Sequence, residues 1–138
     1  MLSGIGQGTV VAALCFLLFI NNLPETITNS FAGLFCDDTL LSKEITCEED
    51  AVELQNDLNN VYEWSVIWGM KFNANKSVVM TVTNKNKPLD NKYYLNNMLP
   101  VQCLAKKNSI KYLCVTIDNR LTFKDFIQEK CHNATKVL

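Results

Sequence analysis

Two adjacent carboxylates, Asp37 and Asp38, are the residues whose types and spacing most directly suggest chemistry. They stand between two short apolar runs, residues 30–35 and 39–42, which places both side chains at the tip of a predicted β-hairpin. Like charges this close raise the pKa of one carboxyl unless a cation neutralises them. A hard divalent ion such as Mg²⁺ is often held by one or two carboxylates together with substrate phosphates. The pair therefore predicts a cation site; the alternative for the dipeptide by itself is an Asp-rich turn, which is common.

The other side chains that could bind metals argue against a zinc site. The only histidine is His132, and the cysteines stand at irregular spacings with no Cys-x-x-Cys pair. The six cysteines are Cys15, Cys36, Cys47, Cys103, Cys114 and Cys131. Several have apolar neighbours, where a free thiol behaves as a small hydrophobe. We expect free thiols and an intracellular protein.

Residues 9–20 (TVVAALCFLLFI) form an apolar segment that predicts a helix capped by Thr9. Its twelve residues are too few to cross a bilayer, which takes about 20. A secretory signal is also disfavoured, because no Lys or Arg precedes the segment and no small-x-small cleavage site follows it. The glycosylation sequons at Asn75 and Asn133 would matter only in a secreted chain. Because the helix is apolar all round, we expect it to be buried in a layered domain and predict no membrane partner.

Residues 47–68 predict the clearest helix of the chain. Thr46 and Glu49 have the spacing of a capping box, and Gly69 stands where a C-terminal glycine belongs. One face of the helix is defined by steps of three and four residues. The members of this face are Ala51, Leu54, Leu58, Val61, Ser65 and Trp68.

The rest of the chain predicts short strands followed by a helix. Residues 77–82 and 110–117 each read as one strand, and residues 92–101 as a hairpin that turns at Asn96 and Asn97. Thr122 with Asp125 could cap the last helix. The apolar side of that helix would comprise Phe123, Phe126, Ile127, Cys131, Ala134 and Val137. The order of elements predicts an α+β fold with an antiparallel sheet.

Composition and charge fit one globular domain with an uneven charge distribution. The 138 residues are 48% hydrophobic and contain no biased segment or repeat. Residues 1–70 carry one Lys against ten acidic residues, a net charge of −9, whereas residues 71–138 carry twelve Lys or Arg against four acidic residues, a net charge of +8. The basic half could contact a phosphate backbone. Two solvated faces that partly neutralise each other are the alternative.

Four blocks, in order along the chain, resemble the reverse transcriptases of non-LTR (LINE-like, jockey-type) retrotransposons. The first block is the glycine-rich loop and helix, SGIGQGT at residues 3–9 and FLLFINNL at 16–23. The second is the catalytic hairpin, LFCDDTLL at residues 34–41. The third, WSVIWGMKFN at residues 64–73, is followed by Lys76, and the fourth is YLCVTIDNRLTF at residues 112–123. The resemblance implies that residues 1–107 are part of the palm, and that residues 108–138 are the primer-grip region and the start of the thumb.

The resemblance also implies roles for individual residues in two-metal nucleotidyl transfer. Asp37 would be the main ligand of Mg²⁺ or Mn²⁺, with support from Asp38, and Lys76 would lie near the triphosphate of the incoming dNTP. The residues that would contact substrates are Gln7 and Gly8, beside the nucleotide and template, and Leu113 and Cys114, at the primer end. The partners implied are an RNA template and a DNA primer.

Departures from the family pattern lead us to expect an inactive chain. Gly6 replaces a proline of the loop, and Cys36 and Cys114 replace the usual alanine and glycine. The other essential aspartate of the family lies upstream of the loop, and only two residues precede Ser3. Without the upstream palm and fingers segment, we expect an incomplete metal site, an exposed sheet edge and an uncovered apolar helix.

Two alternative functions remain open from the sequence. The first is a nucleic-acid-binding or interaction module that kept the fold and lost the chemistry, which the basic second half would favour. The second is a small secreted protein whose cysteines form disulfides.

Overall fold

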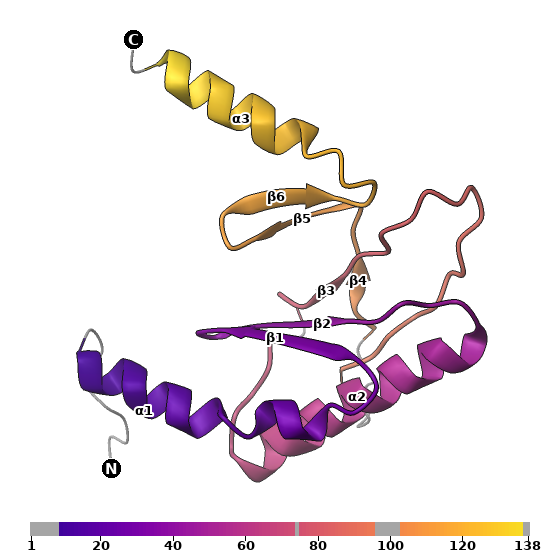
Figure 1. Cartoon of the computed structure of the whole chain (residues 1–138). Helices are drawn as coiled ribbons and strands as arrows, with labels where there is room; N and C mark the ends of the chain where they lie inside the picture. Colours follow the sequence, from indigo (N-terminus) through magenta and orange to yellow (C-terminus); the bar gives the residue numbers. More distant parts are fainter. Residues whose placement is uncertain (1–8, 74, 96–102, 137–138) are drawn as a thin grey trace. The chain divides into compact units, whose positions relative to one another are not determined.

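A computed structural model describes residues 9–73, 75–95 and 103–136 (Figure 1). Its contacts divide the chain into two units. Unit 1 consists of Met1–Phe72 and Tyr94–Val101, and unit 2 of Asn73–Tyr93 and Gln102–Leu138. Helices and short strands are mixed along the described chain, which confirms the predicted α+β class. In the described part of the chain, no helix is long and apolar enough to cross a membrane.

Helix α1, Val10–Ile20, begins as the sequence predicts but is not buried all round. The Oγ1 atom of Thr9 accepts a hydrogen bond of 3.2 Å from the amide of Ala12 and thus caps the helix. Ile20 is buried, whereas several aliphatic side chains of α1 are more than half exposed. These are Val10, Val11, Leu14, Leu17 and Leu18. The burial predicted from the apolar residues is wrong for the outer side of α1, whereas the uncovered apolar helix expected without an upstream segment is confirmed for the described residues.

The core of unit 1 lies where α1, the 3₁₀ helix η1 (Leu23–Thr26) and α2 (Glu48–Ile67) meet. Its fully buried members are Ile20, Leu23, Val61 and Trp64. The ring of Phe19 packs edge-on against the ring of Trp64, with centroids 6.1 Å apart. The indole Nε1 of Trp64 donates a 3.0 Å hydrogen bond to Oδ1 of Asn22, so the polar atom of this buried ring is satisfied.

The first hairpin pairs strands β1 (Phe31–Phe35) and β2 (Asp38–Ser42), as predicted. The register runs from Phe31 opposite Ser42 to Phe35 opposite Asp38, which leaves Cys36 and Asp37 as the turn. Leu34 and Leu41 pack against the core of unit 1. This apolar contact holds one face of the hairpin and leaves its tip in solvent.

Helix α2 confirms the predicted long helix, but its cap differs by one residue. The N-cap is Cys47 and the capping carboxylate is Asp50 rather than Glu49. Oδ2 of Asp50 accepts hydrogen bonds from the amides of Thr46 and Cys47 at 2.7 and 3.1 Å, and from Oγ1 of Thr46 at 2.7 Å. The bonds from Thr46 and Cys47 hold the pKa of Asp50 well below its usual range. Gly69 has a φ of +67°, which confirms the predicted terminating glycine.

The buried face of α2 is only partly the predicted one. Its buried residues are Ala51, Asp57, Val61, Trp64 and Ser65. Trp68 is 43% exposed, and the charged Asp57 takes a buried position instead. A count of apolar steps of three and four could not include a buried carboxylate, which explains this difference.

Unit 2 contains two short strand pairs instead of long strands. Strand β3 (Val78–Val79) pairs in parallel with β4 (Ala105–Lys106), an exception to the predicted antiparallel pairing, and the strand predicted over residues 77–82 is limited to the two residues of β3. Strands β5 (Ser109–Tyr112) and β6 (Val115–Asp118) form an antiparallel hairpin where one strand was predicted over residues 110–117. The predicted turn at Asn96 and Asn97 lies outside the described residues.

Helix α3, Lys124–Thr135, has Phe123 as its N-cap residue and not the predicted Thr122. The carboxylate of Asp118, at the end of β6, organises the connection. It accepts hydrogen bonds from the amides of Arg120 at 3.0 Å, Thr122 at 3.1 Å and Phe123 at 2.8 Å, and from Oγ1 of Thr122 at 2.9 Å. Leu121 and Phe123 have φ of +55° and +54°, a region that costs energy for L-residues and persists where surrounding contacts enforce it.

Asp118 should make the start of α3 sensitive to acid. The hydrogen bond from the amide of Thr122 is the largest cause that lowers the pKa of Asp118, from 3.8 to about 2. Because the folded pKa is depressed, its stabilising effect is present above pH 3.8 and is lost as the pH falls towards about 2. We expect the NMR carbon shifts of the first turn of α3 to move towards random-coil values in that window. In Asp118→Asn the carbon shifts of this turn should already lie nearer to random-coil values at pH 5, and they should change less as the pH falls. Identical pH profiles for the variant and the unaltered chain would contradict the role of Asp118.

Candidate active site

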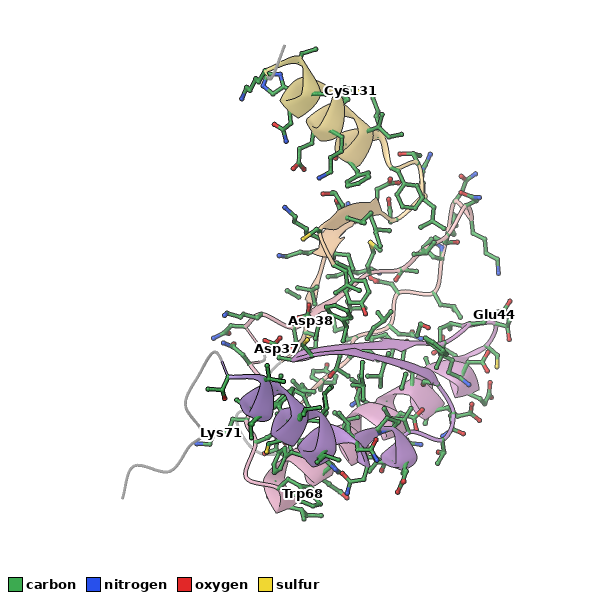
Figure 2. The ribbon with its side chains drawn as sticks, turned by 60° about the vertical axis from the view of Figure 1, so that its left-hand side comes forward. Asp37, Asp38, Glu44, Trp68, Lys71 and Cys131 are labelled. Atoms are coloured by element: carbon green, nitrogen blue, oxygen red, sulfur yellow. The ribbon has the colours of Figure 1, made fainter. Side chains whose placement is uncertain are left out.

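Asp37 and Asp38 lie side by side at the tip of the β1–β2 hairpin, and both are exposed. Figure 2 shows the two residues at one end of the hairpin and Glu44 beyond the other end. Asp37 is the second turn residue, whereas Asp38 is the first residue of β2. The preceding Cys36 has a φ of +51°, a conformation that glycine adopts more readily. The paired strands thus present both carboxylates to solvent.

The donor set suits a hard cation and falls short of a complete cage. In proteins, Mg²⁺ is usually bound by one or two carboxylates, and its remaining ligands are waters or phosphate oxygens. Unit 1 carries two lysines against ten acidic residues, a net charge of −8 that favours cations. Within residues 9–73, 75–95 and 103–136, no group of three or more His, Cys, Asp or Glu side chains is arranged to hold a metal. The residues present therefore fit part of a magnesium or manganese site.

The other predicted site residues belong to unit 2 or to the undescribed part of the chain. Lys76 is exposed, and its backbone amide donates a 2.9 Å hydrogen bond to the carbonyl of Asn73. Lys76 belongs to unit 2, whereas Asp37 and Asp38 belong to unit 1. Gln7 and Gly8 lie outside the described residues.

Leu113 and Cys114 are the turn of the β5–β6 hairpin. Both have positive φ, +46° and +66°, as both central residues of a type I′ turn require. Both side chains are exposed at this tip. Asn and Gly are favoured in such turns, so the Leu-Cys pair gave no hairpin signal in the sequence, although a glycine expected at Cys114 pointed to an unusual backbone.

Sequence reasoning missed Asp57, a carboxylate in the middle of α2 with 0% exposure. Its Oδ1 accepts a 3.1 Å hydrogen bond from the amide of Thr28, and its Oδ2 a 3.0 Å bond from the amide of Asn29. Burial raises the pKa of Asp57, but these amide bonds help to outweigh that effect and leave the pKa below its ordinary value. An acidic residue four positions before Val61, on an otherwise apolar face, was the available signal.

All six cysteines are free thiols, as predicted. Five of them are exposed, including Cys36 beside the aspartates, and Cys15 is partly buried. This arrangement does not favour the alternative of a disulfide-stabilised protein.

Comparisons with known proteins point to the same family. Residues 2–117 match the family model described as reverse transcriptase (RNA-dependent DNA polymerase). The chain is 27% identical over 132 residues to "Probable RNA-directed DNA polymerase from transposon X-element" of Drosophila melanogaster, which covers 92% of this chain and 14% of that protein. It is 28% identical over 141 residues to the RNA-directed DNA polymerase from mobile element jockey of Drosophila funebris, with 95% of this chain and 15% of that protein covered. No solved structure gives a significant match.

The match extends over most of this chain, while the chain spans only about one-seventh of the length of these relatives. It includes the glycine-rich block, the Asp37–Asp38 hairpin and most of the β5–β6 hairpin. The chain therefore belongs to the reverse transcriptase family and is related to the RNA-directed DNA polymerases of jockey-type retrotransposons.

Proposed function

We propose that the chain is the part of an RNA-directed DNA polymerase that contributes Asp37 and Asp38 to a two-metal site for nucleotidyl transfer. The observation that carries the proposal is the presentation of two adjacent, exposed carboxylates at a hairpin tip inside the segment that matches the family model. Asp37 would be the main ligand and Asp38 would support it. When bound, Mg²⁺ or Mn²⁺ would stabilise negative charge on the reacting phosphate oxygens.

The remaining residues would bind and orient the substrates. Lys76 would offset charge on the triphosphate of the dNTP, and Gln7 with Gly8 would contact that nucleotide and the RNA template. Leu113 and Cys114, at an exposed tip, would contact the end of the DNA primer. In this proposal residues 1–107 belong to the palm, and residues 108–138 to the primer-grip region and the start of the thumb.

The charge of unit 2 supports contact between this unit and the template–primer duplex. Unit 2 carries eleven Lys or Arg against four acidic residues, a net charge of +7. Lysines that neutralise backbone phosphates release counterions and give salt-sensitive binding. Lys107, just after β4, and Lys111, on β5, are exposed and suited to such contacts.

The first test of the proposal is the affinity of the whole chain for Mn²⁺, a paramagnetic probe. We expect Mn²⁺ to broaden the NMR signals of residues 36–39 first, because the two carboxylates are adjacent there. The double variant Asp37→Asn with Asp38→Asn should lower the affinity about 10-fold or more, at least as much as the loss of supporting groups around a metal usually does. Glu44→Gln removes a like charge beyond the other end of the hairpin (Figure 2) and serves as the matched control.

The outcomes separate catalysis from other roles. Equal affinities in the double variant and in Glu44→Gln would show that Mn²⁺ binds by diffuse charge, and this would overturn the proposed site. We expect no primer extension from this chain by itself with Mg²⁺ or Mn²⁺, because two carboxylates are only part of a two-metal site. Template-dependent incorporation that disappears in Asp37→Asn would contradict that expectation.

A further inference from the structure

The end of the β1–β2 hairpin opposite Asp37 and Asp38 is tied to α2 by a closed set of polar contacts. The residues of this set, which we call the base clamp, are Asn29, Lys43, Glu53 and Asp57. Asn29 lies just before β1, and Lys43 follows β2 directly. Glu53 and Asp57 are four residues apart and therefore neighbours on one side of α2.

Asp57 holds the chain where it enters the hairpin. Its two carboxylate oxygens accept the amides of Thr28 and Asn29 at 3.1 and 3.0 Å, and the Oγ1 atom of Thr28 lies 3.4 Å from Oδ1. Because Asp57 is 0% exposed, these bonds replace the water that its charge would otherwise need. Charge-assisted bonds of this kind are stronger and more directional than neutral ones.

Lys43 holds the chain where it leaves the hairpin. Its Nζ donates a 3.0 Å hydrogen bond to the carbonyl of Asn29 and forms a 2.7 Å ion pair with Glu53. The side chain of Lys43 is only 14% exposed, unlike that of an ordinary surface lysine. The hydrogen bond to Glu53 raises the pKa of Lys43 above its usual value. The ammonium group of Lys43 thus connects the residues just before β1 and just after β2 with α2.

The hairpin needs such an anchor because it has no larger sheet to hold it. Among the described residues β1 and β2 pair only with each other, and an isolated two-stranded hairpin is marginally stable in water. Leu34 and Leu41 pack one face against the core, but apolar contacts are not directional. The polar contacts at the base are directional and therefore fix the orientation of the hairpin on α2.

We propose that the base clamp positions the Asp37–Asp38 turn, so that Asp57 and Lys43 act as positioning residues for the two carboxylates. None of these hydrogen bonds and ion pairs of the clamp involves Asp37 or Asp38. The clamp acts through the paired strands, whose register links Phe31 and Ser42 at the base to Phe35 and Asp38 at the tip. The link to metal binding rests on the proposed function, whereas the link to the conformation of the tip does not.

The test compares Lys43→Met with Lys106→Met in the whole chain. Methionine keeps most of the aliphatic stem of lysine and removes the charge. Lys106 forms an ion pair with Asp90 in unit 2, so its variant loses the same charge and the same kind of contact away from the hairpin. Lys43→Arg should retain both the ion pair and a donor to Asn29, and serves as the rescue variant. Asp57→Asn is the stricter variant, because the amide NH₂ of asparagine cannot accept a backbone N–H.

The first readout is amide hydrogen exchange along the hairpin without any metal. We expect Lys43→Met to speed exchange of the paired amides near the tip, from Leu34 to Thr39, about 10-fold, and expect Lys43→Arg and Lys106→Met to leave it unchanged. Faster exchange confined to residues 29–31 and 41–43 would overturn the proposal, since the clamp would then order only its own surroundings.

The second readout is the Mn²⁺ affinity at the tip. Removing a positive charge from unit 1 should strengthen cation binding if only long-range charge matters. The proposal expects the opposite sign, an affinity about threefold weaker in Lys43→Met and restored in Lys43→Arg. A stronger affinity in Lys43→Met would overturn the role of the clamp in presenting the carboxylates. If the unaltered chain binds no Mn²⁺ at the tip, the proposed metal site fails, and the exchange experiment still decides the positioning role.

Discussion

Trp64→Ala should lower the free energy of unfolding of unit 1 by about 3–5 kcal/mol, the usual cost of removing a buried aromatic side chain. Trp64 is only 4% exposed and belongs to a small buried cluster. Its ring contacts Phe19 edge-on at 6.1 Å and stacks with Trp68 at 6.0 Å. Alanine would leave a cavity between α1 and α2 and would also leave Oδ1 of Asn22 without its donor.

Urea unfolding followed by far-UV circular dichroism would measure this loss. Trp68→Ala is the matched control, because Trp68 contacts the rings of Phe19 and Trp64 but is 43% exposed. We expect a clearly smaller loss for that variant. Trp64→Phe should fall between the two, since it keeps one aromatic ring but removes the Nε1 donor and part of the buried indole. Equal losses of unfolding free energy in Trp64→Ala and Trp68→Ala would contradict the larger contribution expected from the buried Trp64.

Leu23→Ala should cost about 2–5 kcal/mol, the range for large-to-small changes at fully buried aliphatic positions. Leu23 is 2% exposed and begins η1, the short helix that contacts α2. Its side chain belongs to the same buried cluster as Ile20 and the α2 residues Val61 and Trp64. The same unfolding experiment would measure the loss.

Leu18→Ala is the control for the outer side of α1. Leu18 has the same side chain as Leu23 and is 77% exposed, so the change should stay within about 0.5 kcal/mol. A cost similar to that of Leu23→Ala would contradict the exposed face, because it would require that another layer covers Leu18 in solution.

The elements that could be predicted from the sequence are those with strong local signals. The β1–β2 hairpin follows from two apolar runs around a polar turn, and α2 from its acidic first turn and from Gly69. The shift of the cap from Glu49 to Asp50 shows the limit of such signals. Both carboxylates have suitable spacing, and only the local backbone decides which one receives the amides of Thr46 and Cys47.

The features that could not be predicted depend on contacts between distant residues or on unusual backbone conformations. The parallel pairing of Val78 with Ala105 joins residues far apart in the sequence. The β5–β6 turn uses two positive φ angles at Leu113 and Cys114, residues that seldom adopt them, so the apolar run was read as one strand. The outer face of α1 was expected inside because its residues are apolar, yet composition does not reveal whether a second layer is present.

The residues of the candidate site could be predicted from the sequence, but their arrangement in space only in part. The placement of Asp37 and Asp38 at a hairpin tip is confirmed, whereas their metal-binding role stays a prediction. Only the family resemblance identified Lys76, Leu113 and Cys114 as candidate site residues. The residue types and their pattern alone predict an exposed lysine and part of a strand at these positions. Lys43 carried no signal of its own, and Asp57 only its position on an apolar helix face, because the importance of both arises from which backbone groups they meet.

The two units are interleaved along the chain, and this limits how the fragment can be divided or recombined. Unit 1 ends at Phe72, resumes at Tyr94 and gives way again to unit 2 at Gln102. The side chain of Gln55 pairs with the backbone of Tyr94 in both directions, at 2.8 and 2.9 Å, much as a neighbouring strand would. A single break after Phe72 would therefore separate α2 from the segment that pairs with the partly buried side-chain amide of Gln55. Exchange of unit 1 as a whole between related proteins would need three crossovers, after Phe72, before Tyr94 and before Gln102, because the two units meet at these three points of the chain.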